Sequence, residues 1–428
     1  MKKMLVIGLL LIVGMAFSSA AAPQAPATIK IGVLHSLSGT MAISETTLKD
    51  TILMMIEDQN KKGGLLGKKL EAVVVDPASN WPLFAEKAQQ LLEKDKVAVV
   101  FGCWTSVSRK SVLPVFEKNN GLLFYPVQYE GEESSKNVIY TGAAPNQQAI
   151  PAVDYLMKDL AVKRWVLEGT DYVYPRTTNK ILEAYLLSKG VAAADISINY
   201  TPFGHSDWQT RVAAIKKFGS AGKKTAVVST INGDANVPFY KELGNQKVSA
   251  EDIPVVAFSV GEEELSGLDT KPLLGHLAAW NYFQSVKTPA NTAFINQWHT
   301  YIKSNKRTTN DPMEAHYVGF NLWVKAVQKA GTTDVEKVLA ALPGLETPNL
   351  TGGVAKMLAN HHITKPVYIG EVRADGQFDV VWKTTGTVPG DAWSDFLPGS
   401  KDIDADWVTL KCGNYNKTTK KCSGQNYK

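Results

Sequence analysis

The segment Phe101–Glu133, FGCWTSVSRKSVLPVFEKNNGLLFYPVQYEGEE, most constrains what this chain can fold into. It begins at the end of an apolar, β-rich run, turns through small and polar residues at 102–106, and continues with apolar residues spaced as on one face of a helix. A second apolar run follows at Leu122–Tyr125. A strand that stops in such a turn and restarts as a helix leaves N–H groups and hydroxyls at the carboxyl edge of a parallel sheet, where α/β proteins bind small polar ligands.

The same alternation of strand and helix recurs on both sides of this segment. Upstream, apolar strand-like runs at 28–34 and 70–76 alternate with helical patterns at 44–60 and 82–94. Downstream, strand-like runs at 164–168, 196–200, 225–230 and 255–259 are again separated by helical patterns. Near-continuous apolar strands that alternate with helices predict parallel sheets covered on both faces. We therefore expect the α/β class, with two Rossmann-like lobes.

The length and three breaks in the rhythm indicate how these lobes are connected. A chain of 428 residues exceeds one ordinary domain. Breaks at Tyr140–Gln148, at Leu277–Phe283 and near Thr351–Gly353 predict three crossovers, and thus a hinge with a cleft. We expect an N-terminal lobe from 28–143 and 282–350, a C-terminal lobe from 144–281 and 351–398, and a tail at 399–428.

The N-terminus has the layout of a secretory signal peptide. Lys2 and Lys3 precede an apolar run at 4–17, and small residues follow at 18–22. The apolar run is too short to span a bilayer comfortably. We expect residues 1–21 to be removed and the mature protein to be periplasmic, without a membrane-spanning segment of its own.

The three cysteines fit an oxidising compartment. Cys412 and Cys422 enclose a short polar loop, and a local disulfide between them is the simplest interpretation. Cys103 is then left over. A catalytic thiol needs an activating partner such as His, and no His lies near Cys103 in the sequence. We expect Cys103 to be a buried structural residue.

Charge and motifs disfavour several functional classes. The formal charge is only +5, two of the positive charges lie in the expected signal peptide, and no Lys/Arg block is interleaved with aromatic residues, so we expect no nucleic-acid partner. The G-x-S-x-G, H-E-x-x-H, P-loop and G-x-G-x-x-G motifs do not occur, and His361-His362 has no third ligand at useful spacing. We expect no enzyme, no metal and no cofactor.

Four runs make the pattern specific enough to compare with a family: GCWTS-x-SRK-x-VLPVFE at 102–117, LLFYPVQYEGEE at 122–133, YTGAAPNQQ at 140–148 and DYVYPR at 171–176. They resemble the urea ABC-transporter substrate-binding proteins, which group with short-chain amide receptors among the type I periplasmic binding proteins. The resemblance covers Thr28–Trp393. It implies a Venus-flytrap fold of two lobes joined by three crossover strands, which closes on urea or a small amide and delivers it to the membrane permease of an ABC importer.

The resemblance also implies site residues. The family's amide-sensing regulator uses an aromatic residue and a Ser after Gly-Cys, a Tyr in the next strand and a Tyr in the Asp-Tyr-x-Tyr-Pro loop. These positions fall on Trp104, Ser106, Tyr125 and Tyr174. That regulator has Thr two residues beyond the strand Tyr, where this chain has Val followed by Gln128, so different contacts are expected there.

The chemistry of urea indicates which of these side chains would donate hydrogen bonds to the ligand and which would accept them. Urea offers one carbonyl acceptor and several N–H donors around a planar core, so its site needs donors, acceptors and flat apolar walls. We expect the Ser106 hydroxyl and the N–H groups near Thr105 to serve the oxygen, and tyrosine hydroxyls or a carboxylate to accept from nitrogen. The complete set of candidates is Ser38, Trp104, Thr105, Ser106, Tyr125, Gln128, Glu130, Asp171, Tyr174 and Tyr282.

Simpler interpretations and two other functions stay open at this point. Ser106 could only cap the helix that follows, and Glu130 could lie on a solvated face. A receptor for branched-chain amino acids would share the fold, but it would need opposed charged partners for the α-amino and α-carboxylate groups. An amide-sensing regulator of transcription would need no export signal.

Overall fold

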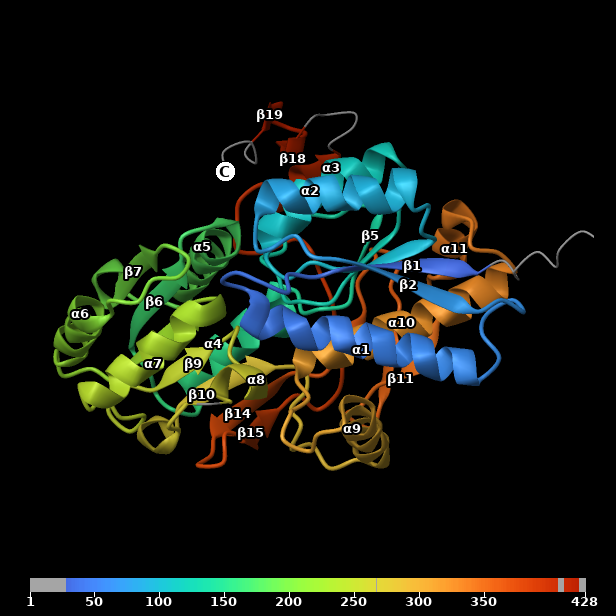
Figure 1. The fold of residues 1–428 in the computed structure, drawn as a ribbon. Coiled ribbons are helices and arrows are strands. Elements are labelled where there is room, and N and C mark those ends of the chain that lie inside the picture. Colours follow the sequence, from blue (N-terminus) through green and yellow to red (C-terminus); the bar gives the residue numbers. More distant parts are fainter. Residues whose placement is uncertain (1–27, 267, 407–411, 423–428) are drawn as a thin grey trace, which may run out of the picture.

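The computed structural model describes residues 28–266, 268–406 and 412–422, with side chains described throughout these ranges except at 403–415 and 422. The expected signal peptide at 1–21 lies outside the described residues. The described chain forms two α/β lobes, each built on its own sheet (Figure 1).

The first lobe is built on a parallel five-stranded sheet in the order β2-β1-β3-β4-β5. This is a doubly wound order, in which the chain reverses direction across the sheet between β1 and β3. The strands are β1 (Ile29–Leu34), β2 (Leu70–Val75), β3 (Val99–Gly102), β4 (Leu123–Tyr125) and β5 (Val138–Tyr140). The helices of this lobe are α1 (Ala42–Lys61), α2 (Trp81–Gln89), α3 (Ser106–Lys118), α9 (Pro289–Ile302), α10 (Asp311–Ala330) and α11 (Val335–Ala341).

The second lobe is built on a seven-stranded sheet in the order β15-β14-β10-β9-β8-β6-β7. Five strands are parallel, and the β14–β15 hairpin adds two antiparallel strands at one edge. The strands are β6 (Arg164–Thr170), β7 (Ile196–Thr201), β8 (Thr225–Thr230), β9 (Val255–Ala257), β10 (Leu277–Trp280), β14 (Tyr368–Val372) and β15 (Phe378–Lys383). The helices are α4 (Ala149–Lys158), α5 (Val173–Ser188), α6 (Gln209–Gly219), α7 (Asn236–Asn245) and α8 (Glu262–Leu265).

Central strands are buried along their whole length because helices cover both faces of each sheet. Every residue of β3 and β8 is buried. Both faces of each sheet therefore contribute to a core, and function has to be sought at the strand ends.

The three segments that connect the lobes meet at one side chain. The Nδ2 atom of Asn281, which follows β10, donates to the carbonyl oxygens of Gln147 at 2.9 Å and Pro366 at 2.7 Å. Gln147 lies on the first connection and Pro366 on the third. The backbone N–H of Asn281 donates to Asp311 Oδ2 on α10 at 2.8 Å. Asn281 thus joins all three connections and ties them to the first lobe.

The packing of residues 355–363 bears on where the third connection lies. Ala355, Met357 and Ile363 pack in the core cluster of the first lobe, although the expected boundary is at residue 350. The glycines at 352 and 353 belong instead to the turn of a small hairpin, β11 (Glu346–Pro348) and β12 (Val354–Lys356). We therefore propose a crossing near residue 365; the other lobe boundaries stay predictions.

Short strands complete the fold. One pair joins β13 (Thr364–Lys365) to β16 (Val388–Pro389), and the tail forms a sheet of β17 (Ile403–Asp406), β18 (Cys412–Asn416) and β19 (Lys421–Cys422). In its register Cys412 pairs with Asp406 and Cys422 with Tyr415. The side chains of both cysteines lie outside the described part, so the disulfide stays a prediction.

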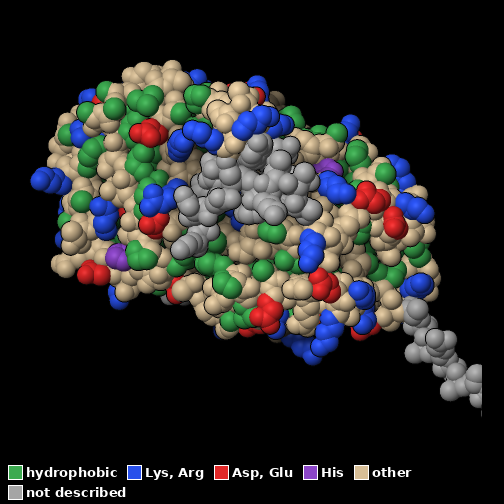
Figure 2. All heavy atoms as spheres, turned by 90° about the horizontal axis from the view of Figure 1, so that it is seen from above, with side chains coloured by type: hydrophobic (Ala, Val, Ile, Leu, Met, Phe, Trp, Pro, Cys, Tyr) green, Lys and Arg blue, Asp and Glu red, His purple; other side chains and the backbone are tan. Residues whose placement is uncertain are grey.

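Two surface properties bear on possible partners: the helices of the described residues and the distribution of charge. Among the described residues, none of the helices combines the length and the hydropathy needed to cross a membrane. Seen from above, Lys and Arg side chains are scattered over the molecule with Asp and Glu between them (Figure 2).

Candidate ligand-binding site

Both sheets place a loop with polar and aromatic residues where their strand order reverses. In the first sheet, β3 neighbours β1, and its carboxyl end continues into Cys103–Thr105 and helix α3. In the second sheet, β6 lies between β7 and β8, and its carboxyl end continues into Asp171–Tyr172 and helix α5. Ligands of open α/β sheets bind at such switch points. Helices α3 and α5 contact each other, so the two loops face one another across the lobes (Figure 1).

Backbone constraints fix the turn after β3. A Cβ atom on Gly102 would lie 2.4 Å from the carbonyl oxygen of Leu34, so only glycine fits there. Cys103 has φ +64°, in the left-handed region, and its N–H donates to the same Leu34 carbonyl at 2.8 Å. Thr105 then caps α3, since its hydroxyl accepts from the Ser108 N–H at 3.1 Å. The cap of this helix is thus Thr105, and the alternative that Ser106 is the cap is wrong.

A buried arginine organises the residues behind this turn. The Nε atom of Arg109 donates to Glu133 Oε1 at 2.7 Å, and Nη2 donates to Glu130 Oε1 at 3.0 Å. Lys110 adds a hydrogen bond of 2.7 Å to Glu133 Oε2. The Arg109 guanidinium also lies 4.8 Å from the ring centroids of Tyr125 and Tyr129. The two cations and two carboxylates are all buried and pair with one another.

This pairing decides the protonation of Glu133. Burial alone would raise its pKa, but the charges of Arg109 and Lys110 outweigh burial and lower the pKa of Glu133 to about 2. Burial likewise opposes the charge of Arg109, whereas Glu133 and Glu130 raise the pKa of its guanidinium above its ordinary value. Glu133 and Arg109 therefore both carry their charge at neutral pH.

The Ser106 hydroxyl forms hydrogen bonds within the same network. Ser106 Oγ donates its proton to Glu130 Oε2 and accepts from Arg109 Nη1 at 3.2 Å. A hydroxyl has one proton and two acceptor lone pairs. Ser106 therefore keeps one free lone pair and no free proton, so it can accept from a ligand N–H. The expectation that its hydroxyl donates to a ligand oxygen does not fit these contacts.

Tyr125 holds the turn from the next strand. Its hydroxyl donates to the carbonyl oxygen of Trp104 at 2.5 Å, and Trp104 is 2% exposed. The tyrosine hydroxyl is thus used within the protein, and it holds the backbone of the turn at Trp104.

The second lobe adds further polar groups. Gln128 Nε2, from the first lobe, donates to Ser259 Oγ of the second lobe at 2.7 Å. Gln128 and Ser259 both lie close to the Tyr174 hydroxyl, which is buried. Tyr172 packs with Tyr174 and with Val107 of α3 in a small apolar cluster. We call Trp104, Ser106, Arg109, Tyr125, Gln128, Glu130, Tyr172, Tyr174 and Ser259 the interlobe cluster.

Three buried polar atoms of this cluster have no hydrogen-bond partner among the described residues. They are Trp104 Nε1, Gln128 Oε1 and the Tyr174 hydroxyl. An indole N–H is a donor, an amide oxygen is an acceptor, and a phenol hydroxyl can be either. Buried polar atoms are normally paired, and an unpaired one is costly. The cluster therefore offers donors and acceptors without charge, and it holds them away from bulk water.

The contacts of three other candidates lead away from the cluster. The exposed Ser38 donates to Asp76 at 2.9 Å. Asp171 is exposed and pairs with Arg176 at 2.5 Å. The buried Tyr282 hydroxyl is shared between Asn291 at 2.6 Å and Thr309 at 2.7 Å. A ligand role for these three stays a prediction that none of these contacts supports.

Several residues of the cluster could not be expected from local patterns. Arg109 reads as a surface residue of a helix, because Arg is rarely fully buried. Ser259 and Gln128 lie 131 residues apart in sequence. Tyr172 stands in the DYVYPR run next to the expected Tyr174, and that run was the available signal for it.

Cys103 lies beside the cluster as a thiol. It is free and fully buried, and burial raises the pKa of its thiol well above the ordinary value. A neutral thiol is a poor nucleophile. This fits the expected structural role for Cys103.

Comparison with known proteins agrees with this fold. The model of the family described as "Periplasmic binding protein domain" matches residues 29–399. The "Leu/Ile/Val-binding protein BraC3" of Rhizobium johnstonii is 26% identical over 350 residues, which cover 79% of this chain and 89% of that protein. The structure of an ABC-transporter solute-binding protein from R. palustris in complex with 4-hydroxybenzoate has a TM-score of 0.73 at 21% identity, and covers 87% of this chain and 100% of that one.

One further match is partial. A "Limonene hydroxylase" of Geobacillus stearothermophilus is 30% identical over 122 residues, but the match covers only 28% of this chain and 22% of that protein. Because so little of either chain is involved, this likeness does not carry an activity over.

Proposed function

The chain belongs to the family of periplasmic binding protein domains, and from this membership we propose that it captures urea or a short-chain amide between its lobes and delivers it to an ABC importer. The ligand would lie in the interlobe cluster. Residues 1–21 would direct export to the periplasm, where a receptor of this kind meets its permease. On this proposal the protein is a receptor and not an enzyme.

The observation that carries the proposal is the set of unpartnered, uncharged polar atoms. Trp104 Nε1 would donate to the carbonyl oxygen of the amide, and Gln128 Oε1 would accept from its N–H groups. The remaining lone pair of Ser106 provides a second acceptor, and the Tyr174 hydroxyl can serve either side. This matches one carbonyl acceptor with several N–H donors.

The charges of the cluster argue against a charged ligand. An amino acid needs charged partners or several converging hydrogen bonds for its carboxylate and for its ammonium group, and an aromatic acid needs them for its carboxylate. In the cluster, Arg109 is already paired with Glu130 and Glu133. Burying a ligand charge without a partner is costly. The Leu/Ile/Val-binding relatives give the second candidate function, branched-chain amino-acid capture, and the paired charges disfavour it.

The size of the ligand limits the affinity. Very small ligands reach at most about 1.5 kcal/mol per non-hydrogen atom, so urea is limited to about 6 kcal/mol, a dissociation constant of tens of micromolar. Tight capture requires that every polar atom of the ligand is paired in a dry site. The burial of Trp104, Ser106 and Tyr174 provides such surroundings.

Closure would follow from contacts to both lobes. Trp104 and Ser106 belong to the first lobe, and Tyr174 to the second. A ligand that contacts both lobes binds their closed arrangement more tightly and shifts the population toward it. The Gln128–Ser259 hydrogen bond already crosses between the lobes in this arrangement.

Thermal unfolding of the mature protein tests the proposal. A ligand with a dissociation constant of tens of micromolar, added at about 10 mM, stabilises the folded state by roughly 3 kcal/mol. We expect urea, formamide or acetamide to raise the melting temperature by several degrees, and leucine to leave it unchanged when the same concentration is used. A shift with leucine and none with the amides would replace this proposal by the branched-chain candidate.

A further inference from the structure

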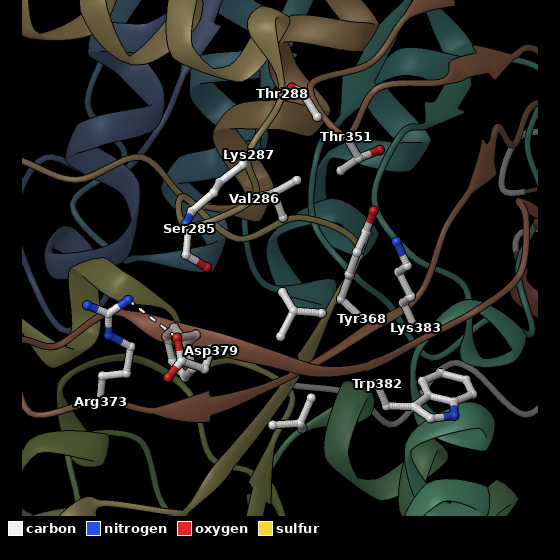
Figure 3. Close-up of a pocket in the computed structure, with 13 residues that line it drawn as sticks. Ser285, Val286, Lys287, Thr288, Thr351, Tyr368, Arg373, Asp379, Trp382 and Lys383 are labelled. Atoms are coloured by element: carbon white, nitrogen blue, oxygen red, sulfur yellow. Dashed lines mark hydrogen bonds and ion pairs between the residues drawn. The ribbon is translucent and has the colours of Figure 1, made fainter.

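A groove that shares no residue with the interlobe cluster has the composition of a second binding site (Figure 3). It has a volume of 590 Å³, within the range of small-molecule sites. One wall is the segment Ser285–Thr288, which leads from the second connection into α9. The other is the β14–β15 hairpin, and Thr351 closes one end.

The walls of the groove come from both lobes. The segment at 285–288 is tied to α9 of the first lobe, since Asn291 Nδ2 donates to the carbonyl oxygens of Gln284 at 2.9 Å and Val286 at 2.6 Å. The hairpin belongs to the sheet of the second lobe. A ligand in the groove therefore contacts both lobes. It favours the arrangement of the lobes in which the two walls of the groove lie close to each other.

Part of the groove lining is apolar. Val286, Val380 and Val381 line it, and Val380 and Val381 are 37% and 42% exposed. The ladder between β14 and β15 shifts register at Ile369/Gly370, where Val381 is the extra residue. Such a bulge turns neighbouring side chains out of the regular pleat, which leaves two valines exposed on the hairpin. Exposed apolar side chains gathered in a concavity mark binding sites.

The polar groups of the groove carry unpaired positive charge. Lys287 stands on one wall and Lys383 on the other, both are exposed, and neither has an ion-pair or hydrogen-bond partner among the described residues. Arg373 is different, since it pairs with Asp375 at 2.7 Å and Asp379 at 3.3 Å. In Figure 3, Lys383 and Tyr368 both extend from the hairpin toward Thr351.

We propose that this groove binds a small organic carboxylate that has an apolar ring and no positive charge of its own. The valines would contact the apolar part, and Lys287 and Lys383 the carboxylate, with the Tyr368 and Thr351 hydroxyls as further donors. A peptide strand added to β15 is the other conceivable occupant. The bulge at Val381 disfavours it, because the extra residue interrupts the regular row of backbone groups that a new strand needs.

Isothermal titration with benzoate tests this site, with benzyl alcohol as an uncharged match of similar shape. The variants are Lys287→Gln and Lys383→Gln. Lys337→Gln serves as control, because Lys337 is an exposed lysine of α11 outside the groove. Ser106→Ala reports binding at the interlobe cluster instead. The proposal does not depend on urea binding, so the titration is read in the absence of urea.

We expect benzoate to bind the unaltered protein and benzyl alcohol to bind at least about tenfold more weakly. Each groove variant should weaken benzoate binding by a similar factor, and Lys337→Gln and Ser106→Ala should leave it unchanged. Equal binding of benzoate and benzyl alcohol, full affinity in both groove variants, no benzoate binding, or a loss in Ser106→Ala would each overturn the proposal.

Discussion

At the scale of single residues, the site depends on how each polar atom is shared between protein and ligand. Ser106 and Tyr125 both present hydroxyls, yet their protons are used by Glu130 and by the Trp104 carbonyl. The polar atoms without a partner among the described residues are on Trp104, Gln128 and Tyr174, and Ser106 keeps one free lone pair. On the proposed function, selectivity for a neutral amide would arise from which atoms the protein leaves unpaired, more than from which residue types surround the ligand.

Replacing Ser106 by alanine should weaken urea binding by about 1 to 3 kcal/mol. The change removes an acceptor for the ligand and takes one hydrogen bond from the buried Glu130, while Arg109 keeps that carboxylate paired. Isothermal titration measures the loss. Ser38→Ala is the matched control, since Ser38 is exposed and bonds Asp76. Equal losses in both variants would mean that Ser106 does not contact the ligand.

Replacing Arg109 by glutamine should lower the free energy of unfolding by about 3 to 5 kcal/mol, because it leaves Glu130 buried without its cation and takes one of two from Glu133. Arg109→Lys keeps a charge but loses the planar fork, so an intermediate loss is expected. Differential scanning calorimetry gives the comparison; chemical denaturation with urea is unsuitable because urea is the proposed ligand. A loss below about 1 kcal/mol in Arg109→Gln would show that the network is not structural.

At the scale of elements, the first turn of helix α3 positions Ser106 and Arg109 of the candidate site. The cap at Thr105 holds that turn in place. The strand–turn–helix unit around it was predictable from apolar spacing and small residues. The ion network on its buried side was not. Arg109, Glu130 and Glu133 look like solvent-facing residues in sequence, because buried Arg and Glu are rare and become possible only when tertiary folding pairs them.

Removing the N-cap of helix α3 should lower the stability of the protein. Thr105→Ala deletes the acceptor for the Ser108 N–H and should cost about 1 kcal/mol of stability, whereas Thr105→Ser keeps the hydroxyl and should cost much less. Calorimetric melting of both variants checks this. If the serine variant is as destabilised as the alanine variant, the loss comes from the missing methyl group and not from the cap.

At the scale of the whole molecule, the sequence predicted two α/β lobes, and the structure confirms them. It could not predict how they meet, since contacts such as Gln128–Ser259 and Ser44–Glu264 join residues more than a hundred positions apart. The short helix α8 contributes two of the contacts between the lobes. Glu264 accepts from Ser44 of the first lobe at 2.6 Å, and Glu262 Oε1 accepts from the Gln284 N–H at 2.7 Å.

The stability of this arrangement should depend on pH through Glu262. Burial raises the pKa of Glu262 from 4.5 to about 8, so the folded protein holds a proton that the unfolded chain releases between these values. The contribution of Glu262 is therefore fully present below pH 4.5 and is lost as pH rises toward 8 and above.

Glu262→Gln should remove this dependence. Its melting temperature should exceed that of the unaltered protein at pH 8 by more than it does at pH 5, as measured by calorimetry across that range. Glu57→Gln, at an exposed position of α1, is the control and should follow the unaltered protein. Parallel curves for Glu262→Gln and the unaltered protein would contradict the assignment.

The most direct test of the central claim is isothermal titration of the mature protein with urea, formamide, acetamide and leucine. We predict saturable binding of urea or a short amide at tens of micromolar, and no heat of binding with leucine, because the charges beside the site are already paired. Binding of leucine without any amide would contradict the account.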